Sequence, residues 1–423
     1  MKKYRQRLLD KVLEEYLEGL PAICIDGAKG VGKTSTASRH SAAEFKFDKA
    51  VTREYISASP AFLDSTDKPV LLDEWQRLPF VWDEVKRLVD EDSSPGRFML
   101  TGSAYPKDAT IHSGAGRIVH LRMRPLSIQE REIGTPTVHL SDLLFAKVPE
   151  VSGTTDVTLS DYLEEIARSG LPAINQLSTK NARRQLSGYV DNIIEKEFEQ
   201  LGYTVRRPQA LRNWFASYAA AQATTTNYTT ILDRATPGEP DKPSEKTTRS
   251  YREILEKLWL IDEVAPWLPI GSNYKDLGKT PKHYLVDPAL AMVLLDLTIE
   301  SFGQKDDSDD IGTKGKTELG RFFEALIAQS LQTYALVNDA TLRHFRSSNG
   351  AHEVDFIVQK GKSVLAIEVK LASSSMAYNF KHLNWFAEKF SDFNVTKCVI
   401  TAGPYAFTRN DGIHIIPAAL LGA

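Results

Sequence analysis

Cysteine is nearly absent from this sequence of 423 residues, which has only Cys24 and Cys398. Two distant cysteines exclude a disulfide framework and a cysteine-rich zinc cluster. An excess of one charge sign is also lacking, because 52 basic and 55 acidic residues leave a formal net charge of −3. No whole-molecule field therefore attracts nucleic acid, and any such contact must come from a local patch.

Long apolar runs are missing as well. None approaches the ~18 residues that a membrane helix needs, and the basic stretch 1–21 lacks the apolar segment of a signal peptide. The hydrophobic fraction of 42% and the charged fraction of 25% are typical of globular proteins. We therefore expect a cytoplasmic protein with no membrane partner and with two to four domains of about 100–200 residues each.

Short buried-strand candidates alternate with helical segments in the first part of the chain. They lie at 22–26, 70–74, 97–103 and 117–127. This alternation predicts a parallel sheet covered on both faces, within a first domain at 1–136.

The rest of the chain divides at changes of pattern. A helical connector is expected at 137–205, a winged-helix-like domain at 206–302, and an α/β domain at 303–423 that begins with an acidic linker. The last domain reads as helix 317–336, strands 341–347, 353–358 and 363–370, helix 376–390, and strands 395–401 and 412–416. The predicted fold class is α/β multidomain.

The segment GAKGVGKT (27–34) matches G-x-x-x-x-G-K-[ST] between a strand and a helix, the context that a phosphate-binding loop requires. Its glycines let backbone N–H groups surround phosphates, Lys33 would reach the β- and γ-phosphates, and Thr34 would ligate Mg²⁺. The predicted cofactors are ATP and Mg²⁺. The predicted cofactor-binding residues are Gly27, Ala28, Lys29, Gly30, Val31, Gly32, Lys33, Thr34 and Asp73.

Acidic and hydroxyl side chains follow the next two strands. Asp73 ends a buried strand where it would hold Mg²⁺ through water, and Glu74 would orient and deprotonate the attacking water. Thr101 and Ser103, at the end of the following strand, could each form a hydrogen bond to the γ-phosphate or the water, and Ser103 is the chosen candidate. A helix-capping role for Ser103 stays open. Spacing alone does not single out Arg117.

Five segments in order resemble one large prokaryotic family: GAKGVGKT, VLLDEWQRLPFVWDEVKRLV, RFMLTGSA, GRIVHLRMRPLSIQERE and SGLPAI. These are AAA-type ATP-binding proteins that carry a C-terminal domain of unknown function, number 4143. The resemblance implies that Arg117 is an arginine finger supplied by a neighbouring subunit of a homo-oligomer. The family loop usually has Pro-Arg-Gln where this chain has Ala28-Lys29-Gly30.

The segment HEVDFIVQKGKSVLAIEVK (352–370) predicts a hairpin with Lys360 and Gly361 in the turn. Pairing of Gln359 with Lys362 puts Asp355 opposite Ala366, with Glu368 diagonal to it at roughly 7–8 Å. Asp355, Ala366, Glu368 and Lys370 then share one face and the opposite face is apolar and buried. Two carboxylates at this spacing would hold one divalent cation, and Lys370 would polarise a phosphate or activate a water.

Asp-x12-Glu-x-Lys on paired strands resembles the PD-(D/E)XK nuclease signature, and the order of helices and strands around it is similar to that fold. Glu324 in the preceding helix resembles the extra metal-binding Glu of some of these nucleases. The resemblance implies Glu324, Asp355, Glu368 and Lys370 as catalytic residues, with Asp355 and Glu368 as metal ligands. A charged hairpin face is also the ordinary solvent side of a sheet.

A helix after the polar stretch 235–247 carries Lys246, Arg249 and Arg252, which a recognition helix could use on phosphates. Acidic residues share this helix, so a solvated amphipathic helix with Tyr251, Ile254, Leu255 and Leu258 inside is the favoured interpretation.

These motifs and the resemblance lead to two hypotheses for the function. The first is an ATPase coupled to a nuclease-like domain that acts on nucleic acid. The second is an ATP-gated DNA- or protein-binding regulator whose nuclease-like domain is catalytically silent.

Overall fold

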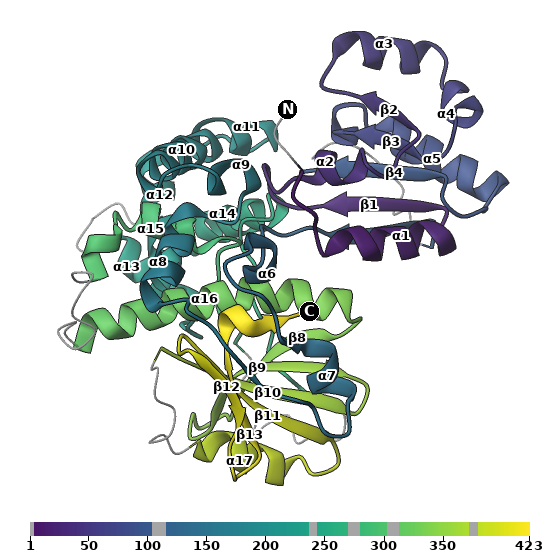
Figure 1. Ribbon diagram of the computed structural model, residues 1–423. Coiled ribbons are helices and arrows are strands. Elements are labelled where there is room, and N and C mark those ends of the chain that lie inside the picture. The colour runs from purple at the N-terminus through teal and green to yellow at the C-terminus, as the bar shows by residue number, and fades with distance from the viewer. Residues whose placement is uncertain (1–3, 104–115, 237–242, 270–279, 303–312, 372–379) are drawn as a thin grey trace.

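The computed structural model describes residues 4–103, 116–236, 243–269, 280–302, 313–371 and 380–423. Figure 1 shows three regions: a sheet domain near the N-terminus, a helical middle and a second sheet domain that ends the chain. In the described residues, no helix combines the length and the apolar character needed to cross a membrane.

The N-terminal domain is built on a five-stranded sheet in which all strands are parallel, in the order β2-β3-β4-β1-β5. The strands are β1 (Ala22–Asp26), β2 (Ala43–Lys46), β3 (Val70–Asp73), β4 (Phe98–Gly102) and β5 (Ile118–Arg122). Four of them agree with the predicted strands. The exception, β2, carries Glu44 and Lys46 and no long apolar run, so its strand character was not apparent from the sequence.

Both faces of this sheet are buried because successive side chains alternate across it. Ile23 and Ile25 pack with Leu9 and Leu13 of α1 (Leu9–Gly19) on one side. Cys24 and the other alternate residues pack beneath helices on the second side. The remaining helices of this domain are α2 (Lys33–Ala37), α3 (Ala50–Ala58), α4 (Phe62–Ser65), η1 (Trp75–Arg77), α5 (Phe80–Glu91) and α6 (Ile128–Arg131).

The middle region is helical, as expected. It contains α8 (Leu159–Arg168), α9 (Pro172–Asn175), α10 (Thr179–Asn192), the π-helix η2 (Ile193–Glu197), α11 (Phe198–Gln200), α12 (Pro208–Ala220), α13 (Tyr228–Ala235), α14 (Glu245–Lys257), α15 (Pro288–Leu294) and η4 (Ile299–Phe302). On α14 the side chains of Tyr251, Ile254 and Leu255 are buried, while Lys246 and Arg249 are exposed. This confirms the amphipathic interpretation of that helix.

The C-terminal domain has a mixed seven-stranded sheet in the order β7-β12-β13-β11-β10-β9-β8. Its elements are α16 (Thr313–Val337), β8 (Thr341–Arg346), β9 (Glu353–Lys360), β10 (Ser363–Lys370), α17 (Lys381–Lys389), β11 (Asn394–Thr401), β12 (Tyr405–Thr408), β13 (Ile413–Pro417), η5 (Ala418–Leu420) and β14 (Leu421–Gly422). The predicted elements all occur among the described residues, although 376–379 of the predicted helix 376–390 lie outside them, and β12, η5 and β14 are additional.

The expected helical connector is not helical throughout. Its first part contains β6 (Val138–His139), α7 (Leu140–Phe145) and β7 (Gly153–Thr154). β7 joins the C-terminal sheet through β12, and β6 pairs with β14. One continuous cluster of buried apolar side chains runs from α1 through α8 and α15 to α16 and β10. The three regions therefore share a core.

Candidate nucleotide and carboxylate sites

The phosphate-binding loop (residues 27–34) follows β1 directly. A Cβ atom built on Gly27 would lie 2.2 Å from the Met123 carbonyl oxygen, so only glycine fits there. Gly32 has φ +104°, which a side chain would strain. The Lys33 ammonium is buried and donates to the carbonyl oxygens of Gly27 at 2.7 Å and Ala28 at 3.0 Å. Burial lowers the pKa of Lys33 to about 8, although nearby acidic side chains oppose this shift.

Asp73 is the centre of a compact oxygen cluster. Its Oδ1 accepts hydrogen bonds from Thr34 Oγ1 at 2.6 Å and from Thr101 Oγ1 at 2.5 Å. The parallel register places Asp73 beside Thr101. Carboxylate and hydroxyl oxygens are the hard ligands that Mg²⁺ prefers, so the donor set present here fits this ion. Of the two hydroxyls that end β4, Thr101 contacts Asp73.

Glu74 adopts a left-handed conformation with φ 57° at the end of β3, which is unusual for a non-glycine residue. Gln76 Nε2 donates to Glu74 Oε2 at 2.7 Å and to Ser103 Oγ at 3.5 Å. The structure thus brings Ser103 close to Glu74 through Gln76, a residue that the sequence analysis did not single out. Strained backbone of this kind is often found at functional sites.

Arg117 lies away from the loop of its own chain. Ile118 pairs with Ala22, where β1 begins, whereas Arg122 pairs with Asp26 next to the loop. Five residues of strand separate the two ends by about 16 Å. Arg117 Nε contacts Asp90 Oδ1 at 2.7 Å. Arg117 thus lies next to the end of β5 that is far from the phosphate-binding loop of its own chain.

A buried arginine that the sequence analysis missed supports the loop from behind. Arg7 Nε pairs with Glu130 Oε1 at 2.8 Å, and its other two nitrogens donate to the carbonyl oxygens of Val31 and Arg124 at 2.7 Å each. Glu130 also closes a capping box with Ser127 at the start of α6. The S-x-x-E spacing of that box was the one available signal for Glu130.

The loop also contacts the middle region. Lys29 Nζ lies 2.8 Å from Glu197 Oε1 of η2, and Tyr189 OH of α10 donates to the Lys29 carbonyl oxygen at 3.2 Å. A Cβ at Gly30 would lie 3.9 Å from Leu171, and one at Gly32 would lie 3.8 Å from Pro172. The SGLPAI segment (169–174) thus packs against the phosphate-binding loop.

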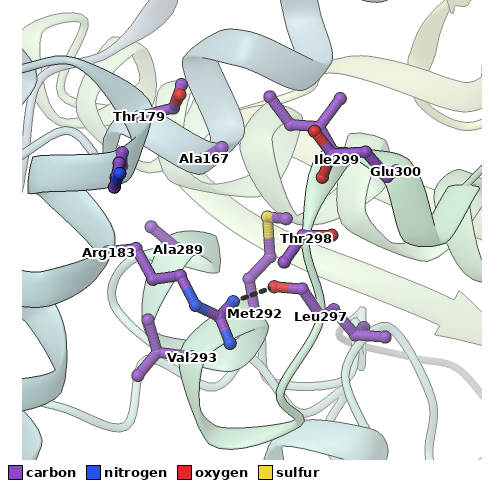
Figure 2. A pocket seen from close by; sticks show the side chains of 11 residues that line it. Ala167, Thr179, Arg183, Ala289, Met292, Val293, Leu297, Thr298, Ile299 and Glu300 are labelled. Carbon is purple, nitrogen blue, oxygen red and sulfur yellow. Dashed lines mark hydrogen bonds between the residues drawn. The ribbon is translucent and has the colours of Figure 1, made fainter.

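Two pockets flank these elements. The first, of about 950 Å³, opens beside α2 and is lined by Tyr4, Arg5, Gln6, Asp10, Glu14, Arg39, His40, Glu132 and Gln176. Tyr4 OH lies 2.9 Å from Thr36 Oγ1, which connects this pocket to α2. The second, of about 230 Å³, is mostly apolar and lies in the middle region, where Arg183 donates to the Leu297 carbonyl oxygen (Figure 2). None of the predicted site residues lines either pocket.

The hairpin forms as expected, but its predicted register is wrong by two positions. Lys360 pairs with Ser363 and Ile357 with Ala366, so the turn is Gly361–Lys362. Gly361 has φ +60°, which suits the first central position of a tight turn. The regular pairing of the two strands extends to Phe356 and Ile367, next to Asp355 and Glu368. The expected shared face is not kept at Asp355, because β9 is irregular there: the β8–β9 register shifts between Arg343 and Phe345, and Val354 is buried in the same cluster as Ile357 and Ala366.

The expectation of one buried and one charged face is also wrong. Ile357, Val364 and Ala366 are buried together with Leu383 and Phe386 of α17. The opposite face is buried too, in the core that includes α16. The charged residues thus occupy only the end of the sheet, because α17 covers the rest of that face.

A lysine that the sequence analysis did not consider lies among the predicted metal ligands. The Lys282 ammonium contacts Asp355 Oδ1 at 2.9 Å, Glu324 Oε1 at 3.0 Å and Glu353 Oε1 at 3.4 Å. Burial opposes its charge, yet these carboxylates raise the pKa of Lys282 above its usual value. Burial raises the pKa of Glu324 to about 7, whereas Lys282 and Lys370 outweigh burial and lower the pKa of Asp355.

Glu368 is less well satisfied than its neighbours. Its Oε2 lies 3.2 Å from Lys370 Nζ, and its buried Oε1 has no hydrogen-bond partner among the described residues. Burial raises the pKa of Glu368. The structure therefore gathers Glu324, Asp355, Glu368 and Lys370 at one end of the sheet, as predicted, with Lys282 in addition.

Comparison with known proteins divides the chain in the same three parts. Residues 20–132 match an AAA domain, residues 159–301 a domain of unknown function (DUF8612), and residues 319–421 a domain of unknown function (DUF4143). Uncharacterized proteins of Mycobacterium tuberculosis and Mycobacterium bovis are each 23% identical over 419 residues, which cover 96% of this chain and 82% of theirs.

Among solved structures, a Walker-type ATPase of Pyrococcus abyssi is 16% identical, with a TM-score of 0.38 over 67% of this chain and 94% of that one. A RuvB variant of Thermotoga maritima is 18% identical, with a TM-score of 0.26 over 61% of this chain and 88% of that one. The domain matches confirm the expected combination, and the chain carries an N-terminal AAA P-loop domain joined to a C-terminal DUF4143 domain.

Proposed function

We propose that this protein binds ATP with Mg²⁺ and hydrolyses it. The proposal rests on one observation, the Asp73 carboxylate that accepts hydrogen bonds from both Thr34 and Thr101 at the mouth of the phosphate-binding loop. Thr34 and Asp73 would hold Mg²⁺, which neutralises phosphate charge when bound. Glu74, held by Gln76, would orient the attacking water and accept its proton.

The remaining parts of the nucleotide have matching surroundings. Lys33 donates to two loop carbonyl oxygens. The β- and γ-phosphates of a bound nucleotide would replace these carbonyls as acceptors, because their charged oxygens accept hydrogen bonds more strongly. The wide pocket beside α2, with Tyr4 and His40 in its lining, would take the nucleoside. Lys29 and the backbone of residues 27–32 would complete the phosphate contacts.

Two variants test the ATPase separately for binding and for chemistry. Lys33→Ala should abolish binding of a fluorescent ATP analogue, because it removes the one buried ammonium of the loop. Glu74→Gln should retain binding and lower turnover by about 10²-fold or more, since general-base contributions are of this order. Glu91→Gln, on the exposed end of α5, is the matched control. Wild-type affinity in Lys33→Ala would refute the site.

The same contacts support nucleotide gating. The loop touches η2 through Lys29 and packs against Leu171 and Pro172, so a change at the phosphates would reach the middle region directly. In this form of the proposal the ATP state sets self-association through Arg117. The helices α12–α14 with the antiparallel bridges Ile261–Leu285 and Val264–Lys282 would act as a winged-helix-like surface for DNA or protein.

DNA cleavage by the C-terminal domain is the second candidate function, favoured by the clustering of Asp355, Glu368 and Lys370. Its test is incubation of plasmid or branched DNA with the protein, ATP and Mg²⁺ or Mn²⁺. Cleavage that is lost in Asp355→Ala and in Lys370→Ala would support it. Absence of cleavage on every form of DNA would favour the ATP-gated regulator with a silent domain.

A further inference from the structure

Lys282 is fixed in position by its own backbone. It lies on the short segment 280–286, where its N–H and C=O groups exchange hydrogen bonds with Val264 at 2.9 and 3.0 Å. Pro266, two residues beyond Val264, forms a bridge with His344 of β8. The side chain of Lys282 is 2% exposed. This ammonium is therefore part of a ladder that connects the middle region to the C-terminal sheet, unlike a mobile surface lysine.

The oxygen atoms around this ammonium are already engaged. Asp355 uses Oδ1 for Lys282 and Oδ2 for the backbone N–H of Val369 at 2.9 Å. Glu324 Oε1 accepts from Lys282 and also from Tyr284 OH at 2.6 Å. Tyr284 comes from the same segment as Lys282, so this segment supplies two donors to the cluster. Both oxygens of the expected metal ligand Asp355 are thus satisfied by the protein itself.

We propose that the Lys282 ammonium is the resident cation of the cluster formed by Glu324, Glu353 and Asp355. It occupies the position that a divalent cation would take between Asp355 and Glu324. A divalent ion binds carboxylate oxygens at about 2.1 Å for Mg²⁺ or 2.3–2.6 Å for Ca²⁺, and it cannot share these atoms with an ammonium in contact with them. The wild-type cluster is therefore metal-independent, and it fastens the middle region to the C-terminal domain.

Glu368 has a carboxylate oxygen that is still able to bind a cation. It is 6% exposed, and its unpartnered Oε1 lies at the same end of the sheet as Asp355. If the positive charge at position 282 is removed, Asp355, Glu324 and Glu368 would become an all-carboxylate set with Lys370 as a neighbouring cation, and their side chains would have to move closer together to ligate one divalent ion. Such a set is suited to Mn²⁺ or Ca²⁺. The proposal therefore predicts a latent metal site that a single substitution exposes.

Mn²⁺ binding in the absence of nucleotide tests this inference. Free Mn²⁺ is followed by its electron paramagnetic resonance signal during titration of the full chain. Wild type and Glu368→Gln should bind Mn²⁺ equally, because the cluster contributes no site. Lys282→Gln should gain one bound Mn²⁺ per chain with an affinity about tenfold or more above the wild-type background, and Mn²⁺ should raise its melting temperature. Lys360→Gln, an exposed lysine next to the hairpin turn, is the control for loss of charge.

The outcomes separate cleanly. A wild-type Mn²⁺ site that disappears in Glu368→Gln would overturn the proposal, and this comparison stands even if Lys282→Gln fails to fold. A folded Lys282→Gln that gains no Mn²⁺ would overturn it as well. Any weak binding near Asp73 is common to all four proteins and cancels. Because no nucleotide is present, failure of the proposed ATPase would leave these results unchanged.

Discussion

Lys29 of the phosphate-binding loop and Glu197 of the π-helix η2 form an ion pair with an Nζ–Oε1 distance of 2.8 Å. Single turns of π-helix often occur at functional sites. Here the π-helix places an acidic residue of the middle region against a loop side chain that nucleotide phosphates would also attract. The pair is half exposed on the lysine side, with 39% of that side chain accessible. It is therefore weak enough to exchange partners.

Removal of this competition should strengthen nucleotide binding. Glu197→Gln frees Lys29 for the phosphates, and a partly exposed pair contributes up to about 1 kcal/mol. We expect ATP to bind about two- to fivefold more tightly, as measured with a fluorescent analogue. Glu195→Gln, exposed on the same π-helix, should change nothing. Weaker binding in Glu197→Gln would mean that Glu197 positions Lys29 for the nucleotide instead of withholding it.

Gly27→Ala should destabilise the N-terminal domain and abolish nucleotide binding, because the new Cβ would lie 2.2 Å from the Met123 carbonyl oxygen. Overpacking of this kind costs about 1–3 kcal/mol, which lowers a melting temperature by roughly 2–4 °C per kcal/mol in a domain of this size class. Gly19→Ala is the control, since a Cβ there meets no atom within 4 Å. Equal melting curves for the two variants would contradict the expected clash.

Stability should fall as the pH drops below the usual pKa of histidine, owing to His344. Burial, with help from the Lys282 charge, lowers the pKa of His344 to about 4, against about 6.5 in an unfolded chain. Between these values the unfolded chain binds a proton that the folded chain does not. The contribution of His344 is therefore full above pH 6.5 and is lost toward pH 4, with a size on the order of 3 kcal/mol.

Urea unfolding of wild type and His344→Gln at about pH 5 and about pH 7.5 measures this contribution. The difference in the free energy of unfolding between the two pH values should be smaller in His344→Gln than in wild type. Glu324 acts in the opposite sense, since a carboxyl whose pKa is raised in the folded state stabilises at low pH. It remains in both proteins, so the comparison isolates His344. An unchanged pH dependence would show that folding leaves the pKa of His344 near its usual value.

Arg117→Ala should lower ATP turnover while ATP affinity stays the same, because Arg117 lies far from the loop of its own chain. A finger contributes about 10³–10⁵-fold in related phosphoryl transfers. The decisive measurement mixes Arg117→Ala with Lys33→Ala. Each is inactive alone, and mixed assemblies should recover part of the activity, since one subunit supplies the loop and the other the arginine. Arg87→Ala, on the exposed face of α5, is the control.

No recovery in the mixture, or full turnover in Arg117→Ala, would contradict a finger supplied by a neighbour. A strictly monomeric protein with full ATPase activity would contradict it equally. The Asp90 partner of Arg117 offers a further check. Asp90→Asn should leave binding and turnover intact if that ion pair is only the resting contact of Arg117.

Local patterns carried most of the fold. Contiguous apolar runs identified β1, β3, β4 and β5, and the loop motif placed Lys33, Thr34 and Asp73 correctly at one edge of the sheet. The strand β2 was not predicted, because the sequence of an edge strand with charged side chains resembles that of a loop. The hairpin register depended on which two residues turn, and Gly361 fits a left-handed conformation in either of two positions. Both choices give a two-residue turn, so the alternation along β10 was predicted correctly, whereas the irregularity of β9 next to Asp355 was not.

The contacts that the sequence could not predict join residues far apart in the chain. Lys282 meets Asp355 across 73 positions, and Arg7 meets Glu130 across 123. Nothing local distinguishes these two cations from solvated ones. They are buried because the three regions share a core, and the hydrophobic periodicity of the sequence does not predict how the regions pack together. For the same reason the winged-helix interpretation of the middle region stays a prediction.

The pairing of β14 with β6 bears on how the protein assembles during synthesis. Leu421 pairs with Val138, and the Ala423 N–H donates to Gln129 Oε1 at 3.0 Å. Gln129 and Val138 leave the ribosome nearly three hundred codons before Ala423 and Leu421 do. The stretch around Val138 must therefore wait for this strand partner until Leu421 has been synthesised. Chaperones that shield nascent strands would have their longest opportunity at this segment.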